Sequence, residues 1–156
     1  MNHAEFLARI AAARHELDQL VGQLSPEQVV IPGVEGKWSV KDILAHITWF
    51  DREMIGMLLA RALVGSPWWN LPQEERNQRI YELALQRPAS QVLVESRNAF
   101  AELIELLQEL TDADLNETGR FRDMPPDWRL IDVLSGNTFE HYEDHARSIR
   151  QFFQLS

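Results

Sequence analysis

Three histidines carry the clearest chemistry in the sequence. His141 and His145 are four residues apart, and His46 lies in an apolar segment in the first half of the chain. Four residues along a helix exceed one full turn by about 40°, so one metal ion can contact both His141 and His145. The chain has no cysteine, which excludes thiolate ligands, disulfides and cysteine nucleophiles. Imidazole ligands without sulfur predict a divalent cation, with zinc or nickel as the expected ion.

The positions of these histidines in the helix pattern favour a shared site. His46 falls in an apolar stripe between Ile43 and Phe50, and His141 and His145 fall on the apolar side of the last predicted helix. A buried neutral imidazole needs partners for both nitrogens, and a metal ion together with an outer carboxylate supplies them. The residues expected to make that outer contact are Asp42, Asn137, Glu140 and Asp144.

Each histidine alone has another interpretation, as a core or rim residue that bonds a neighbouring backbone or side-chain group. That alternative loses weight when three histidines point inward together. His3 and His15 lie in the first predicted helix beside charged residues. We expect both on the surface and outside the site.

Three neutral imidazoles leave a bound ion with its positive charge and at least one open coordination position. Such an ion can lower the pKa of a bound water for hydrolysis, or hold a small-molecule thiolate for transfer to an electrophile. The sequence leaves both reactions open. Glu53 is the candidate catalytic base, because it lies seven residues after His46 and so within about 20° of the same helix face. The alternative for Glu53 is a solvated or salt-bridged acid.

Four amphipathic segments must position these groups. Apolar residues recur at spacings of three and four, which predicts no sheet and four helices, over 3–24, 40–64, 88–110 and 130–153. The two halves also resemble each other, because Trp38 precedes Asp42 by four residues just as Trp128 precedes Asp132. Two helical hairpins joined by a long connection predict an all-α four-helix bundle, formed as a single domain over 1–156.

Composition and charge limit the binding partners and the cellular location that we expect for this chain. The chain has a formal net charge of −9 and only two lysines, Lys37 and Lys41, so we expect no nucleic-acid partner. The most apolar stretch, 54–64, is about half as long as a bilayer span, and no membrane association is expected. The N-terminus lacks a signal-peptide pattern and the chain lacks cysteine, which together favour the cytoplasm.

Three tryptophans, Trp49, Trp68 and Trp69, are too large to lie comfortably in solvent. They are compatible with the wall of an apolar pocket, with core packing or with a homodimer interface. The sequence does not distinguish these roles.

The segments WSVKDILAH (Trp38–His46) and GNTFEHYEDH (Gly136–His145) resemble the DinB-like superfamily, also called the YfiT-like metal-dependent hydrolases. The resemblance covers nearly the whole chain. It implies a four-helix bundle in up-down-down-up order, with a long crossover between the second and third helices. It also implies a divalent metal held by one histidine of the second helix and two of the fourth, which here are His46, His141 and His145.

Relatives with assigned activities include S-transferases and isomerases that use bacillithiol or mycothiol, while many have no known reaction. The group that protects against colibactin is similar at the start of the second helix but usually has tyrosine in place of His46, so the metal-bearing branch is the better match. The family name refers to induction by DNA damage and implies no DNA binding.

The resemblance and the histidines together predict a metal-dependent enzyme that acts on a small molecule, by hydrolysis or by transfer of a low-molecular-weight thiol. Two alternatives from other classes remain open. One is a non-catalytic bundle that binds metal or a small ligand, and the other is an interaction protein that dimerises through a bundle face.

Overall fold

The protein forms a helical bundle in a computed structural model that describes residues 1–156. The helices of the bundle are α1 (His3–Gly22), α3 (Val40–Ala60), α5 (Ala89–Gln108), and α7 (Leu130–Asn137) followed by α8 (Phe139–Phe153). The connections carry α2 (Pro26–Val29), the 3-10 helix η1 (Pro67–Asn70), α4 (Gln73–Ala84) and α6 (Asp112–Asn116). The structure contains isolated β-bridges but no sheet, which confirms the all-α prediction.

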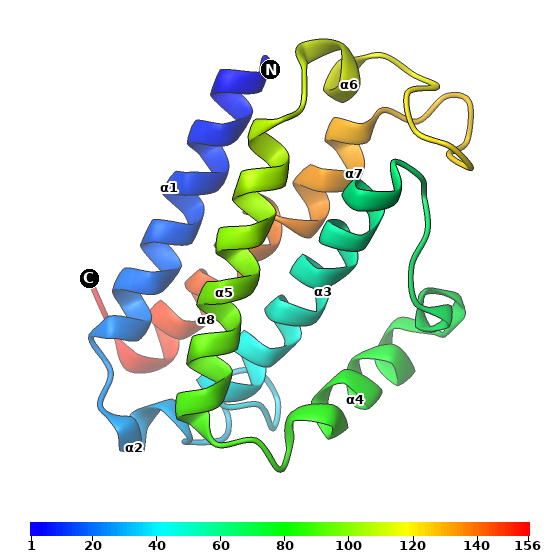
Figure 1. The fold of residues 1–156 in the computed structure, drawn as a ribbon. Coiled ribbons are helices and arrows are strands. Elements are labelled where there is room, and N and C mark those ends of the chain that lie inside the picture. The colour runs from blue at the N-terminus through cyan, green and yellow to red at the C-terminus, as the bar shows by residue number, and fades with distance from the viewer.

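The direction of the helices also agrees with the sequence-based prediction. α1 runs away from the end of the bundle that holds the N-terminus, α3 and α5 both return toward it, and α7 with α8 run away again (Figure 1). α3 packs along α5, and α1 packs along α8. The parallel pair α3 and α5 needs a crossover, which η1 and α4 provide on the outside of the bundle (Figure 1). The bundle therefore has the up-down-down-up order.

Capping boxes define where several helices begin. Asn2, Ser25, Ser39 and Thr111 each accept a hydrogen bond from the backbone N–H three residues later, and the side chain at that position bonds back to the cap. At α3 the returning side chain is Asp42, whose Oδ2 accepts from Ser39 N at 2.8 Å. Asp42 therefore fixes the start of the helix that carries His46, and its carboxylate is already hydrogen-bonded to Ser39.

The predicted helix over 130–153 is two helices in the structure. Thr138 interrupts it with φ −126° and ψ −100°. Its hydroxyl donates to Leu134 O at 2.6 Å, and Asn137 Nδ2 donates to Val133 O at 2.8 Å. Side-chain bonds to preceding carbonyls compete with the helical backbone pattern and bend it. As a result α8 starts afresh at Phe139, two residues before His141.

The helix predicted over 40–64 ends earlier than expected. Arg61 follows the last residue of α3 in a left-handed conformation, with φ 48°, and its N–H bonds to Leu58 O and Met57 O. This cap stops the helix at Ala60, although the apolar pattern continues to Val64.

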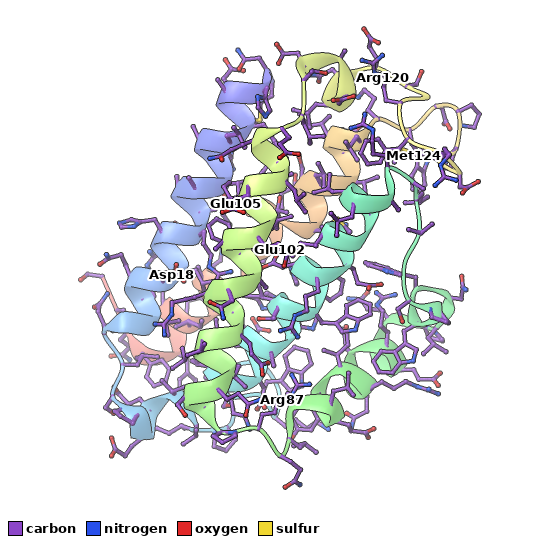
Figure 2. All side chains as sticks on the ribbon, viewed as in Figure 1. Asp18, Arg87, Glu102, Glu105, Arg120 and Met124 are labelled. Carbon is purple, nitrogen blue, oxygen red and sulfur yellow. The ribbon has the colours of Figure 1, made fainter.

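The interior of the bundle is filled by apolar side chains from every long helix. The largest fully buried ones include Phe6 and Ile10 of α1, Ile47 of α3 and Leu103 of α5. Figure 2 shows this packed interior, with Asp18 on α1 and with Glu102 and Glu105 on α5 on the outer surface. No helix is both long enough and apolar enough to cross a lipid bilayer.

Candidate metal centre

The structure brings the three predicted histidines together. His46 comes from α3, and His141 and His145 come from successive turns of α8. The Nε2 atom of His141 lies 3.0 Å from Nε2 of His46 and 3.0 Å from Nε2 of His145. One ligand atom from each of the three lies within 4.8 Å of the others. His3 and His15 lie outside this cluster; His15 is exposed, whereas His3 is half-buried with Nε2 2.8 Å from Leu107 O.

The donor atoms of the cluster fit a cation. His145 Nδ1 faces the carboxylate of Glu35, and an ionised carboxylate only accepts hydrogen bonds. The proton of a neutral His145 is therefore assigned to Nδ1, and its Nε2 keeps a lone pair that faces His141. The Nδ1 atoms of His46 and His141 are buried without a partner. A divalent ion between the three Nε2 atoms would use lone pairs that otherwise face one another.

Burial keeps two of the imidazoles neutral. Burial, followed by the charges of His141, His145 and Arg76, lowers the pKa of His46 to about 2. Burial and the charge of His145 lower the pKa of His141 to about 3. Both side chains therefore present an unprotonated nitrogen at neutral pH, which is the form that binds a metal.

The one carboxylate that bonds to a histidine of the candidate centre is Glu35, which was not among the expected residues. Its Oε1 and Oε2 lie 2.8 and 3.0 Å from His145 Nδ1. Burial raises the pKa of Glu35, but the hydrogen bond from His145 and its charge outweigh burial and hold that pKa below its usual value. A carboxylate in this position fixes the orientation of the imidazole and raises its basicity as a ligand.

Glu35 reaches the site from a tight turn before α3. The N–H groups of Gly33 and Val34 bond to Trp38 O, and Trp38 N–H bonds to Glu35 O at 2.8 Å. Gly36 has φ 56°, which favours glycine. An acidic residue between Gly33 and Gly36, just before a ligand-bearing helix, is the signal in the sequence that could have identified Glu35.

The four residues expected around the metal have other roles. Asp42 bonds to the cap residue Ser39, Asn137 bonds to Val133 O, and Asp144 pairs with Arg147 at 3.1 Å. Glu140 is exposed. None of them bonds to a histidine of the cluster: Asp42 lies on α3, Asn137 on α7, and Glu140 and Asp144 are exposed on α8.

Aromatic rings and one cation form the wall of the centre. The ring of Phe50 lies 4.8 Å from the rings of both His46 and His141, and Trp69 packs edge-on against Phe50 at 5.4 Å. Arg76 of α4 places its guanidinium carbon 5.2 Å from the centroid of the Trp69 ring. Its Nε is buried without a partner. The crossover between α3 and α5 therefore brings a positive charge to the edge of the site.

Glu53 lies against the loop after α3. Its Oε1 accepts from Ser66 N at 2.6 Å and from Trp69 Nε1 at 2.7 Å. These bonds tie the loop to α3 and hold the Trp69 ring in place. A role for Glu53 as catalytic base stays a prediction.

A buried polar network adjoins the histidines, and the sequence pattern did not predict it. Tyr142 donates to Asp51 Oδ1 at 2.6 Å, and Arg14 lies 3.3 Å from Asp51 Oδ2. Arg14 also donates to Ser96 Oγ at 2.6 Å. Burial raises the pKa of Asp51 to about 7, although Arg14 and Tyr142 act in the opposite direction. The network joins α1, α3, α5 and α8, and it fixes the rotation of α8 one residue after His141.

The fold and the three convergent histidines make this protein a four-helix bundle with a candidate metal site. The family model of the DinB superfamily matches residues 9–149 of the chain. The chain therefore belongs to the DinB superfamily. No sequence among the curated proteins matches this chain.

Solved structures share the fold over nearly the whole chain. The sibling lethal factor precursor DfsB is 16% identical, with a TM-score of 0.84, and the match covers 99% of this chain and 96% of that one. An uncharacterised protein from Escherichia coli UTI89 is 17% identical, with a TM-score of 0.80 and the same coverage. The colibactin self-resistance protein ClbS is 12% identical, with a TM-score of 0.82 and coverage of 99% and 97%.

The exclusion of nucleic acid as a partner was wrong for proteins of this fold. ClbS was solved in complex with double-stranded DNA. The exclusion rested on the net charge of −9, which is an average over the whole chain. Binding to phosphates depends on where the cations lie, and a net negative protein can still present a local positive surface.

Proposed function

We propose that this protein is a metal-dependent enzyme of the DinB superfamily that acts on a small molecule at His46, His141 and His145. The observation that carries the proposal is the convergence of their three Nε2 atoms, with His141 at 3.0 Å from each of the other two. Hydrophobic burial already accounts for the stability of a bundle of this size, so a metal is not needed for folding alone.

When bound, a zinc or nickel ion supplies Lewis acidity that lowers the pKa of a water or holds a thiolate. The residues of the chain prepare the site for it. Glu35 orients His145, and the burial of His46 and His141 keeps their nitrogens unprotonated. The aromatic wall at Phe50 restricts the access of water.

Arg76 supports a reaction in which the substrate or co-substrate is anionic. Its guanidinium lies beside Trp69 and Phe50 and carries a buried Nε without a partner. An arginine binds oxyanions or a thiolate most strongly where water is partly excluded. A low-molecular-weight thiol that reacts as its thiolate matches this charge, as does a carboxylate-bearing substrate for hydrolysis.

The test is turnover of two model electrophiles, 1-chloro-2,4-dinitrobenzene and 4-nitrophenyl acetate, by metal-loaded protein with and without a low-molecular-weight thiol. His145→Ala serves as the blank, and His15→Ala, which removes an exposed histidine outside the cluster, serves as the matched control. Thiol-dependent turnover lost only in His145→Ala supports S-transfer. Thiol-independent hydrolysis with the same loss supports the hydrolase.

Equal rates in the wild type and in His145→Ala would overturn the enzymatic proposal. If both proteins lack turnover but only the wild type binds metal, a non-catalytic metal-binding bundle accounts better for the site.

A further inference from the structure

A cavity lies between the C-terminal half of α3, the loop after α3 with η1, and α7 with the residues just before it. It has a volume of about 800 Å³, and none of the three histidines lines it. Met54, the lining residue of α3 closest in sequence to His46, is eight residues beyond it, or about 12 Å along the helix. Cavities of a few hundred to about a thousand Å³ hold small organic ligands. This volume is therefore a candidate binding groove in its own right.

The floor and walls of the groove are apolar and fixed. Met54 and Met57 are 4% and 1% exposed and form part of its lining together with Trp69. The Trp69 indole is held by its hydrogen bond to Glu53. The loop approaches so closely that a Cβ at Gly65 would lie 2.8 Å from Trp69 Nε1. The groove is thus formed before any ligand enters.

The rim of the groove carries a net negative charge. Arg129 donates to both carboxylate oxygens of Asp132, at 2.9 and 3.0 Å, and neutralises it. Asp127 also lines the groove and is exposed, and it has no partner among the ion pairs of the structure. An organic anion would meet uncompensated repulsion at this rim, whereas a cation would not.

Trp128 gives this rim an aromatic surface next to the unpaired acid. Its side chain lines the groove and is 45% exposed, so the ring is open to a ligand at the rim. Tryptophan is the aromatic side chain that attracts cations most strongly. Asp127 and Trp128 therefore favour the same kind of group at the mouth of the groove.

We infer that this groove binds a small hydrophobic cation, an aryl- or alkyl-ammonium compound. Its apolar body lies against Met57 and Trp69, and its ammonium group lies at the rim beside Asp127 and Trp128. No residue of the groove is one of the three histidines, and the one side chain that the groove shares with the wall of the metal centre is Trp69.

The test compares three probes with one apolar body: 4-phenylbutylammonium, 4-phenylbutanol and 4-phenylbutyrate. Each is titrated into full-length protein kept metal-free by a chelator, so that no probe binds through a metal. Indole N–H resonances in ¹H–¹⁵N NMR spectra report the site and the affinity. We expect the ammonium probe to shift Trp69 and Trp128 and to bind about fivefold to tenfold more tightly than the carboxylate.

Two pairs of variants separate the effect of the Asp127 charge from the effect of contact with the Trp128 ring. Asp127→Asn should reduce the preference for the ammonium probe, whereas Asp123→Asn, at an exposed acid outside the groove whose φ of 62° asparagine tolerates, should not. Trp128→Ala should weaken all three probes, whereas Leu59→Ala, at a residue that is 65% exposed and outside the groove, should weaken none.

Equal binding of the ammonium and carboxylate probes would overturn the inference. So would shifts confined to other tryptophans, no binding of any probe, or an undiminished ammonium preference in Asp127→Asn.

Discussion

The Nδ1 atom of His145 lies 2.8 Å from Oε1 of Glu35, which joins the turn before α3 to α8 across 110 positions of the sequence. This contact assigns the proton of His145 to Nδ1 and directs its Nε2 toward the other histidines. It is also the only carboxylate contact of the cluster. The affinity of the site for metal should therefore depend on Glu35.

Replacing Glu35 with alanine should weaken zinc binding about tenfold to a hundredfold, because the orientation and basicity of His145 are lost. Glu35→Gln keeps an acceptor and should cost less. Competition with a chromophoric chelator measures the affinity, and circular dichroism verifies the fold. Glu140→Ala, at an exposed acid of the same helix as His145, is the control and should bind zinc like the wild type. An unchanged affinity in Glu35→Ala would remove Glu35 from the centre.

Gly65→Ala should destabilise the loop that holds Trp69. The new Cβ would lie 2.8 Å from Trp69 Nε1 and 2.9 Å from Glu53 Oε1, so both groups or the loop itself must move. We expect a loss of about 1 to 3 kcal/mol in the free energy of unfolding, with a shifted Trp69 indole resonance.

The control for this change is Gly56→Ala. Gly56 lies within α3, and a Cβ there meets no atom within 4 Å. Alanine should therefore stabilise the protein by up to about 1 kcal/mol. Equal effects of the two substitutions in urea denaturation would show that the loop does not pack on Trp69 as described.

Asp51 should make the free energy of unfolding depend on pH, with a sign that follows from its raised pKa. Burial raises its pKa in the folded protein from an ordinary value of 3.8 to about 7. Between these values the folded state binds a proton that the unfolded state does not. The contribution of Asp51 to the free energy of unfolding is thus fully present below 3.8 and is lost as pH rises through 7. The lowered pKa values of His46 and His141 act in the opposite direction below 6.5.

The contribution of Asp51 is isolated by comparison with Asp51→Asn, measured metal-free in urea at pH 5 and pH 8. The stability difference between the wild type and this variant should favour the wild type more at pH 5, by on the order of 1 kcal/mol per pH unit below 7. A difference for Asp51→Asn that does not change with pH would contradict a protonated Asp51.

The bundle and its histidines could be predicted because both follow from helical periodicity. Apolar residues at spacings of three and four define the helices, and His46, His141 and His145 fall on the same faces as the core residues. Residues that share an inward face of packed helices meet in the interior. No long-range information is needed for that step.

The rest of the site depends on contacts that periodicity does not encode. Glu35 lies in a turn, where no repeat specifies the direction of a side chain. Arg14 and Asp51 are charged residues for which the pattern favours solvent, and their burial requires each other, Ser96 and Tyr142. The break at Thr138 comes with two side-chain bonds to the backbone, from Asn137 and from the Thr138 hydroxyl. Each of these features follows from local chemistry that competes with the helical pattern.

The central claim is that one divalent ion is held by the three histidines, and its most direct test is metal stoichiometry. Tag-free wild type, His141→Ala and His15→Ala are dialysed against micromolar zinc, washed, and analysed for metal per chain. The account predicts one ion per chain in the wild type and in His15→Ala, and none in a folded His141→Ala protein. A wild type that retains no zinc, or a His141→Ala protein that retains a full equivalent, would contradict it.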